Sequence, residues 1–166
     1  MKLETERLYL RRATLKDANF IHALLNSPGW IQYIGDRGIS STEKAIAYIQ
    51  NSLWTSYETN GFGLLTVCLK DRDTPIGLCG FLQRDYLEHP DIGFAFLPSF
   101  EGKGLALEAA NAVMEHGASD LKLKKIHAIC METNVKSVRL LHRLGFQKSG
   151  VIQPDKDGEE LLLFST

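Results

Sequence analysis

The sequence predicts a single α/β domain that spans residues 1–166 and is built on a mixed sheet. One observation is that strand-like apolar segments alternate along the chain with segments whose apolar residues recur at helical spacing. A second is size: 166 residues with 44% hydrophobic content are enough for one core, and no linker, repeat or low-complexity tract divides them. The expected order of elements is β, α, α, β, β, β, α, β, α, β, β.

The first half of the chain is expected to supply one strand, two helices and then two paired strands. Thr14 and Asp17 have the spacing of a capping box, which predicts the start of the first helix. The segment 28–39 is expected to be irregular because Pro-Gly opens it and further glycines follow. An Asn-Gly pair ends the second helix. The expected ranges are 7–12 for the strand, 14–25 and 42–59 for the helices, and 63–69 and 76–82 for the paired strands.

The second half is expected to contain four strands and two helices. Gly93, inside a strand that begins near Asp91, predicts a bulge or a close backbone approach. Asn134 is a favourable N-cap for the last helix, and Gly145 is a natural residue to end it. The expected ranges are 92–97, 125–131, 147–152 and 159–164 for the strands, and 105–116 and 135–144 for the helices.

The most informative segment is the glycine-rich turn at 101–106, which leads from a strand directly into a helix. Such a turn leaves N–H groups unpaired at the positive end of a helix dipole, which predicts a phosphate site. A nucleotide-hydrolysing P-loop is excluded because Lys103 is followed by Gly104 and not by Ser or Thr. A dinucleotide-binding fingerprint is excluded because Leu107 stands where its third glycine is needed.

Three segments carry a resemblance to a known family. The turn Glu-Gly-Lys-Gly-Leu-Ala at 101–106 resembles the Gln/Arg-x-x-Gly-x-Gly/Ala loop with which the GNAT superfamily of acyltransferases holds the pyrophosphate of acetyl-CoA, and Glu101 departs from that pattern. The Asn-Val-Lys-Ser helix at 134–146, ending Leu-Gly-Phe, is a second match. The opening Glu-Thr-Glu-Arg-Leu-Tyr-Leu-Arg-Arg at 4–12 is similar to the RimJ/RimL-type protein N-acetyltransferases. The resemblance covers residues 4–164.

The resemblance implies a GNAT fold, with a mostly antiparallel seven-stranded sheet that is splayed between strands four and five and flanked by about four helices. It implies acetyl-CoA as the cosubstrate, with its pantetheine amides paired to the backbone of the fourth strand. The residues that it places on the cofactor are Phe94, Phe96, Leu97, Glu101, Gly102, Lys103, Gly104, Leu105, Ala106, Asn134, Ser137 and Arg139. Ordinary core packing of the phenylalanines is compatible with this role, because main-chain hydrogen bonds leave the side chains free.

The catalytic residue expected from the resemblance is Asp91, as a general base at the start of the fourth strand. Trp30 and Tyr33, in the irregular segment, are expected to bind the acceptor. Asp36, like Tyr33, is a candidate for positioning the amine, with a turn or rim role as the alternative, and Glu132 is a weaker candidate for proton transfer. The sequence departs from the family at Leu141, where a tyrosine often protonates the leaving thiolate.

The composition of the chain limits the classes of binding partner that we expect. A formal charge of −1 gives no electrostatic case for nucleic acid or an anionic membrane, and no leader-like or membrane-length apolar segment is present. The three cysteines are isolated in apolar runs and the five histidines lack metal-ligand spacing, so we expect reduced thiols, no metal and a cytoplasmic location. The expected partner is an amine-bearing small molecule or a protein N-terminus, bound by a monomer or a homodimer.

The expected activity is an acetyl-CoA-dependent N-acetyltransferase that acts on a primary amine by direct attack on the thioester. A catalytically silent CoA-binding sensor module is one alternative, supported by Glu101 and Leu141. A structural or protein-interaction domain that binds no phosphate is another.

Overall fold

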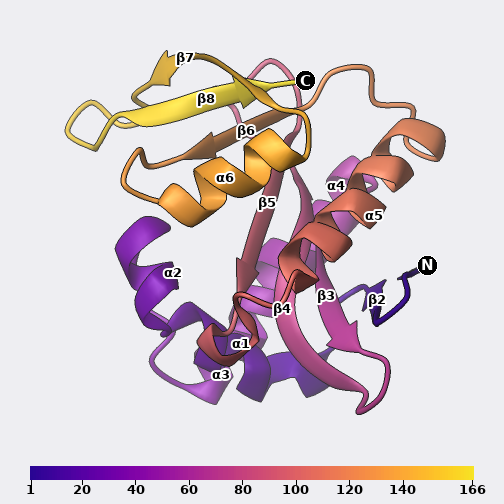
Figure 1. Ribbon diagram of the computed structural model, residues 1–166. Coiled ribbons are helices and arrows are strands. Elements are labelled where there is room, and N and C mark those ends of the chain that lie inside the picture. Colours follow the sequence, from indigo (N-terminus) through magenta and orange to yellow (C-terminus); the bar gives the residue numbers. More distant parts are fainter.

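An eight-stranded sheet organises residues 1–166 of the computed structural model, with strands in the order β1-β2-β3-β4-β5-β6-β8-β7 (Figure 1). All neighbouring strands are antiparallel except β5 and β6. The strands are β1 (Lys2–Glu4), β2 (Leu8–Arg11), β3 (Leu64–Leu69), β4 (Thr74–Leu82), β5 (Asp91–Phe96), β6 (His127–Cys130), β7 (Gln147–Ile152) and β8 (Leu161–Ser165). The predicted α/β domain with a mixed, mostly antiparallel sheet is confirmed, with one strand more than expected.

The additional strand is β1, a three-residue edge strand paired with β2. Its sequence, Lys-Leu-Glu, has only one apolar residue and carries charges typical of an exposed sheet edge, so no strand pattern marks it.

The helices are α1 (Ala18–Leu25), α2 (Pro28–Tyr33), α3 (Thr42–Tyr48), α4 (Thr55–Asn60), α5 (Leu105–Ser119) and α6 (Val135–Arg143). Figure 1 shows α5 in front of β3 and β4, and the helical run from α3 to α4 behind the strands. That run was expected as one helix, and six residues in its middle, Ile49–Trp54, have π-helical hydrogen bonds. No helix is both long and apolar enough to cross a bilayer.

The segment 28–39 was expected to be irregular, and this is wrong for its first half. Pro28 begins α2 at the first helical position, after Ser27 with extended backbone angles. Proline suits that position because it has no N–H to leave unpaired and its φ is already helical. The Pro-Gly pair was therefore a helix start and not only a turn.

Strands β5 and β6 separate immediately after they meet. Their only paired position is Asp91 with His127, where the His127 N–H donates to the Pro90 carbonyl at 2.9 Å. Beyond it β5 continues to Phe96 beside β4, while β6 turns away and pairs with β8 (Figure 1). This is the expected splay between the two strands.

Candidate functional site

The open edge of β5 is the first feature of the candidate site. In an extended strand the N–H and C=O of one residue point to the same side, and successive residues alternate. The Pro90 carbonyl points toward β6, and the Leu97 N–H points toward β4. Because the β4–β5 register is unbroken between these two residues, the main-chain groups of the even-numbered residues point toward β6. The main chains of Phe94 and Phe96 therefore point into the gap, where no strand pairs with them.

Two expectations about this strand need correction. The unbroken register excludes a bulge at Gly93, where a Cβ would instead meet Leu82 Cδ1 at 3.2 Å, a close approach. Leu97 does not offer its backbone to a ligand. Its N–H donates to the Ile76 carbonyl at 2.9 Å, and its carbonyl accepts from Phe100 at 3.0 Å.

The glycine turn follows β5 and opens α5. Gly102 and Gly104 have φ of 75° and 77°, in the left-handed region that glycine adopts without strain. Gly104 is the N-cap of α5, and no side chain caps the helix. The first bond across the start of α5 runs from the Glu108 N–H to the Gly104 carbonyl at 3.1 Å, so the N–H groups of Leu105 and Ala106 have no main-chain partner. The turn therefore presents free donors at the positive end of a 15-residue helix.

Three residues that the sequence did not assign to the site, Thr5, Arg7 and Glu108, fix this turn and the start of α5 through hydrogen bonds. The Arg7 Nη1 donates to the Lys103 carbonyl at 3.0 Å, and the Arg7 Nε donates to Glu108 Oε2 at 2.7 Å. The Thr5 hydroxyl donates to Glu108 Oε1 at 2.6 Å. The opening motif at 4–12 was noticed as a family likeness, but nothing in it shows that it contacts residues a hundred positions later.

Helix α6 provides the opposite wall. The Asn134 side chain caps it by accepting from the Ser137 N–H at 3.3 Å, as its sequence predicts. Arg139 lies exposed on the same helix. Glu101 reaches across to this helix, where its Oε2 lies 2.9 Å from Lys136 Nζ. Leu141, which stands where relatives often have tyrosine, is fully buried and packs in the core.

Asp91 lies where β5 and β6 join. It is 0% exposed, and both its carboxylate oxygens accept from Arg84 Nε, at 3.0 and 3.1 Å. Burial raises the pKa of Asp91 above its usual value, and Arg84 opposes this only in part. Arg84 also donates from Nη1 to the Tyr86 hydroxyl at 3.0 Å. Sequence reasoning missed Arg84 because it lies in the polar segment after β4 and carries no motif.

The acceptor-side candidates lie on α2. Trp30 is buried at 5% exposure, and its indole Nε1 has no hydrogen-bond partner. Tyr33 is half-buried on the same helix. Asp36 accepts from the Gly38 N–H at 2.8 Å, which is a turn contact. Glu132 is exposed after β6.

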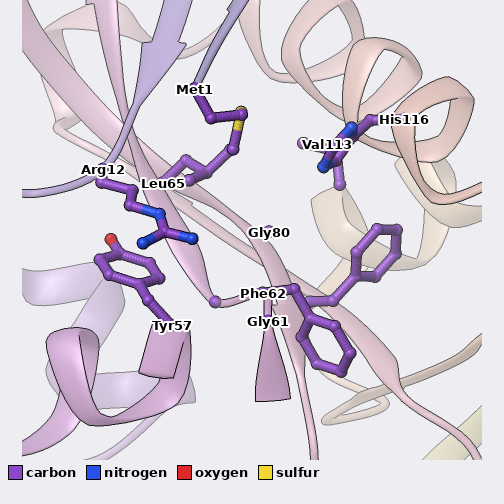
Figure 2. Close-up of a pocket in the computed structure, with 11 residues that line it drawn as sticks. Met1, Arg12, Tyr57, Gly61, Phe62, Leu65, Gly80, Val113 and His116 are labelled. Atoms are coloured by element: carbon purple, nitrogen blue, oxygen red, sulfur yellow. The ribbon is translucent and has the colours of Figure 1, made fainter. Parts of the chain in front are cut away.

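A small cavity lies elsewhere in the molecule, and none of the candidate site residues line it. Figure 2 shows it between the start of the chain, α4, α5 and strands β3 and β4, where the Arg12 guanidinium lies 4.9 Å from the centre of the Tyr57 ring. Its enclosed volume is about 20 Å³, room for about one water molecule. No group of three or more His, Cys, Asp and Glu side chains is placed to hold a metal ion.

Comparison with known proteins agrees with this geometry. Residues 7–147 match the family model described as an acetyltransferase (GNAT) domain. The uncharacterized N-acetyltransferase YoaA of Bacillus subtilis (strain 168) is 35% identical over 155 residues, covering 91% of this chain and 85% of the relative.

Solved structures share the fold. A GNAT-family acetyltransferase from Bacillus anthracis has a TM-score of 0.83 at 23% identity and covers 100% of this chain and 98% of its own. RimL, a ribosomal L7/L12 alpha-N-protein acetyltransferase solved in complex with coenzyme A, has a TM-score of 0.83 at 16% identity, covering 100% of this chain and 97% of its own. The chain therefore belongs to the GNAT family of N-acetyltransferases.

Proposed function

We propose that this N-acetyltransferase uses acetyl-CoA and acetylates a primary amine that attacks the thioester directly. The observation that carries the proposal is the presence of two free main-chain surfaces close together in the chain. The unpaired edge of β5 at Phe94 and Phe96 is followed, after Leu97 and one 3₁₀ turn at Pro98–Phe100, by the free N–H groups of the glycine turn.

The chemistry of acetyl-CoA fits these two surfaces. Its pantetheine arm contains two amides, which the N–H and C=O groups of Phe94 and Phe96 can pair with, as a strand does. Its pyrophosphate fits the turn at Gly102 and Gly104, where glycine lets the backbone approach and the α5 dipole favours negative charge. Asn134, Ser137 and Arg139 on α6 line the opposite side.

The acceptor amine must be neutral to attack. For a lysine side chain, with a reference pKa of about 10.4, deprotonation at pH 7 costs roughly 4.6 kcal/mol, and for an α-amino group near 8 it costs about 1.4 kcal/mol. A C–N bond then forms as the C–S bond breaks, and an N–H group of the β5 edge is placed to polarise the carbonyl. Holding the two bound substrates in the reactive orientation lowers the activation barrier further.

Asp91 is our candidate for the proton acceptor. Its raised pKa makes it a better base than a free aspartate, and Arg84 fixes its orientation. Because Asp91 is fully buried, the proton reaches it through a bridging water or after the bound acceptor displaces Arg84. The departing thiolate has no hydroxyl at Leu141, so it leaves to solvent or takes a proton near Ser137.

The acceptor is proposed to lie against Trp30 and Tyr33. The lower cost of deprotonation favours an α-amino group, as in the RimJ/RimL-type protein N-acetyltransferases that the opening motif resembles, over an unactivated alkylamine. Small-molecule amines with lowered pKa satisfy the same requirement.

The test is a screen of the purified protein with acetyl-CoA against a mixed panel of amines and N-terminal peptides. Free thiol is detected as the product, and the acetylated partner is identified by mass spectrometry. We expect turnover with at least one α-amino compound. Tight binding of acetyl-CoA without turnover over the whole panel would instead support the silent sensor module.

A further inference from the structure

The Glu108 carboxylate, in the first turn of α5, gathers donors from the start of the chain. It accepts from the Thr5 hydroxyl at 2.6 Å, from the Arg7 main-chain N–H at 2.8 Å and from Arg7 Nε at 2.7 Å, and Arg7 Nη2 lies 2.7 Å from it as an ion pair. These bonds leave the Arg7 guanidinium with little rotational freedom. Its planar fork is held in one orientation beside the glycine turn.

The Arg7 guanidinium makes one further hydrogen bond, which is to the turn itself. Arg7 Nη1 donates to the Lys103 carbonyl at 3.0 Å, so a single guanidinium connects the α5 carboxylate to the peptide between Lys103 and Gly104. A Cβ placed on Gly104 would lie 3.5 Å from Arg7 Nη2, which shows how closely the cation approaches the turn.

This bond determines where an N–H group points. In a trans peptide the C=O of one residue and the N–H of the next point in opposite directions. When Arg7 draws the Lys103 carbonyl to one side, the Gly104 N–H must point to the other. That N–H has no main-chain or side-chain partner within the protein. Without the bond, the Lys103–Gly104 peptide, which leads into a glycine with positive φ, would have more freedom to rotate.

We propose that Arg7, locked by Glu108 and Thr5, is a positioning residue that presets the Gly104 N–H as a donor for the pyrophosphate of the cosubstrate. This inference rests on the proposed use of acetyl-CoA. Arg7 acts through the peptide and by its nearby charge, and its guanidinium is already committed to Glu108 and Lys103. A donor that is oriented before binding adds affinity because no ordering has to follow.

The test compares Arg7→Lys with the parent protein. Lysine keeps the charge but has one donor centre, so it cannot bind Glu108 and the Lys103 carbonyl in the same fork geometry. Dissociation constants are measured for CoA by calorimetry and for pantetheine, which lacks the pyrophosphate, by NMR titration. We expect CoA to bind at least about tenfold more weakly, while the pantetheine constant changes by less than about twofold.

Two further variants separate the possible causes. Glu108→Gln keeps the Arg7 charge and loosens its lock, and we expect CoA to bind about threefold to tenfold more weakly. Glu4→Gln is the matched control, because Glu4 lies in the same segment and does not touch the turn. Its carboxylate forms an exposed ion pair with Lys2 Nζ, 3.6 Å away. This variant should leave both constants unchanged.

The outcomes distinguish this inference from the proposed function. Arg7→Lys with a CoA constant within about threefold of the parent would overturn the positioning role, as would an equal loss of affinity for CoA and pantetheine. If Arg7→Lys fails to fold, Glu108→Gln decides by the same comparison. A parent protein that binds no CoA would overturn the proposed function itself.

Discussion

The proposed cofactor wall and the proposed acceptor wall of the candidate site are built in different ways. The cofactor wall consists of main chain: the free edge of β5, the glycine turn and the start of α5, held by contacts from Thr5 and Arg7 at the opposite end of the chain. The acceptor wall consists of side chains on α2, a helix of six residues, where Ile31 is 40% exposed, and Ile34, directly after the helix, is 41% exposed.

This difference indicates where ligand specificity resides. A wall made of backbone groups binds the same ligand while its side chains vary, which is how Glu101 can stand where relatives have Gln or Arg. A wall made of side chains on a short helix changes its chemistry with each substitution. We therefore propose that the reaction class follows from the cofactor wall and that the choice of amine follows from the acceptor wall.

The largest effect is expected at Asp91, where β5 and β6 join. Asp91→Asn removes the proposed base, and we expect kcat to fall about 10²–10⁴-fold with little change in the dissociation constant of acetyl-CoA. Stopped assays of free thiol and calorimetry measure the two effects. Asp85→Asn, an exposed neighbour in the same segment, is the control. An unchanged rate and pH profile in Asp91→Asn would remove Asp91 from the mechanism.

The next largest effect is expected at Gly104. Gly104→Val puts a branched side chain on a residue with φ of 77°, which costs about 1–3 kcal/mol if the turn keeps its shape. We expect acetyl-CoA to bind about tenfold to a hundredfold more weakly. Gly150→Val, in strand β7 with no atom within 4 Å of its Cβ position, is the control. Parental affinity in a folded Gly104→Val protein would show that the pyrophosphate binds elsewhere.

Acid pH should affect the support of the glycine turn by Glu108 and the proposed base Asp91 separately. Burial tends to raise the pKa of Glu108, but the bonds from Thr5 and Arg7 outweigh it and hold that pKa below its usual value, whereas burial raises the pKa of Asp91. Glu108 therefore supports the turn above its ordinary pKa of about 4.3, and this support is lost only as pH falls through its lower folded value. The Asp91 base is lost earlier, as pH falls through a value above the ordinary aspartate pKa of about 3.9.

We therefore expect the rate to decline at a higher pH than the affinity does. The rate is compared with that of Asp91→Asn. This variant lacks the fall in rate that protonation of Asp91 causes, but it keeps the titration of the acceptor amine. Affinity is measured with dephospho-CoA, because a 3′-phosphate would itself titrate near pH 6. Loss of affinity at the same pH as the rate would mean that cofactor binding and the proposed base do not titrate separately.

The conformations of the glycine turn and of the start of α6 could be predicted from the sequence because their signals are local. A left-handed glycine, a helix start and the Asn134 cap are all encoded within a few residues of the structure that they produce. The lock on Arg7 could not be predicted, because Thr5 and Glu108 are 103 positions apart and meet only through the packing of α5 against β1 and β2. Arg84 was missed for a similar reason: its partner Asp91 is near in sequence, but only the turn between β4 and β5 brings the two together.

The smallest effect is expected at Glu101, where this chain departs from the family. A carboxylate directed at the pyrophosphate would repel it, but Glu101 Oε2 lies 2.9 Å from Lys136 Nζ, on the neighbouring wall. Because its charge is already paired and the turn binds through backbone groups, Glu101→Gln should change the acetyl-CoA dissociation constant by less than about threefold. Lys136→Gln, which removes only the partner, should weaken binding more than Glu101→Gln does, since it leaves the carboxylate free near the phosphates. Calorimetry on both variants separates these arrangements. Tightening of tenfold or more in Glu101→Gln would show that the carboxylate faces the ligand, and that side-chain identity does matter on the wall made of backbone.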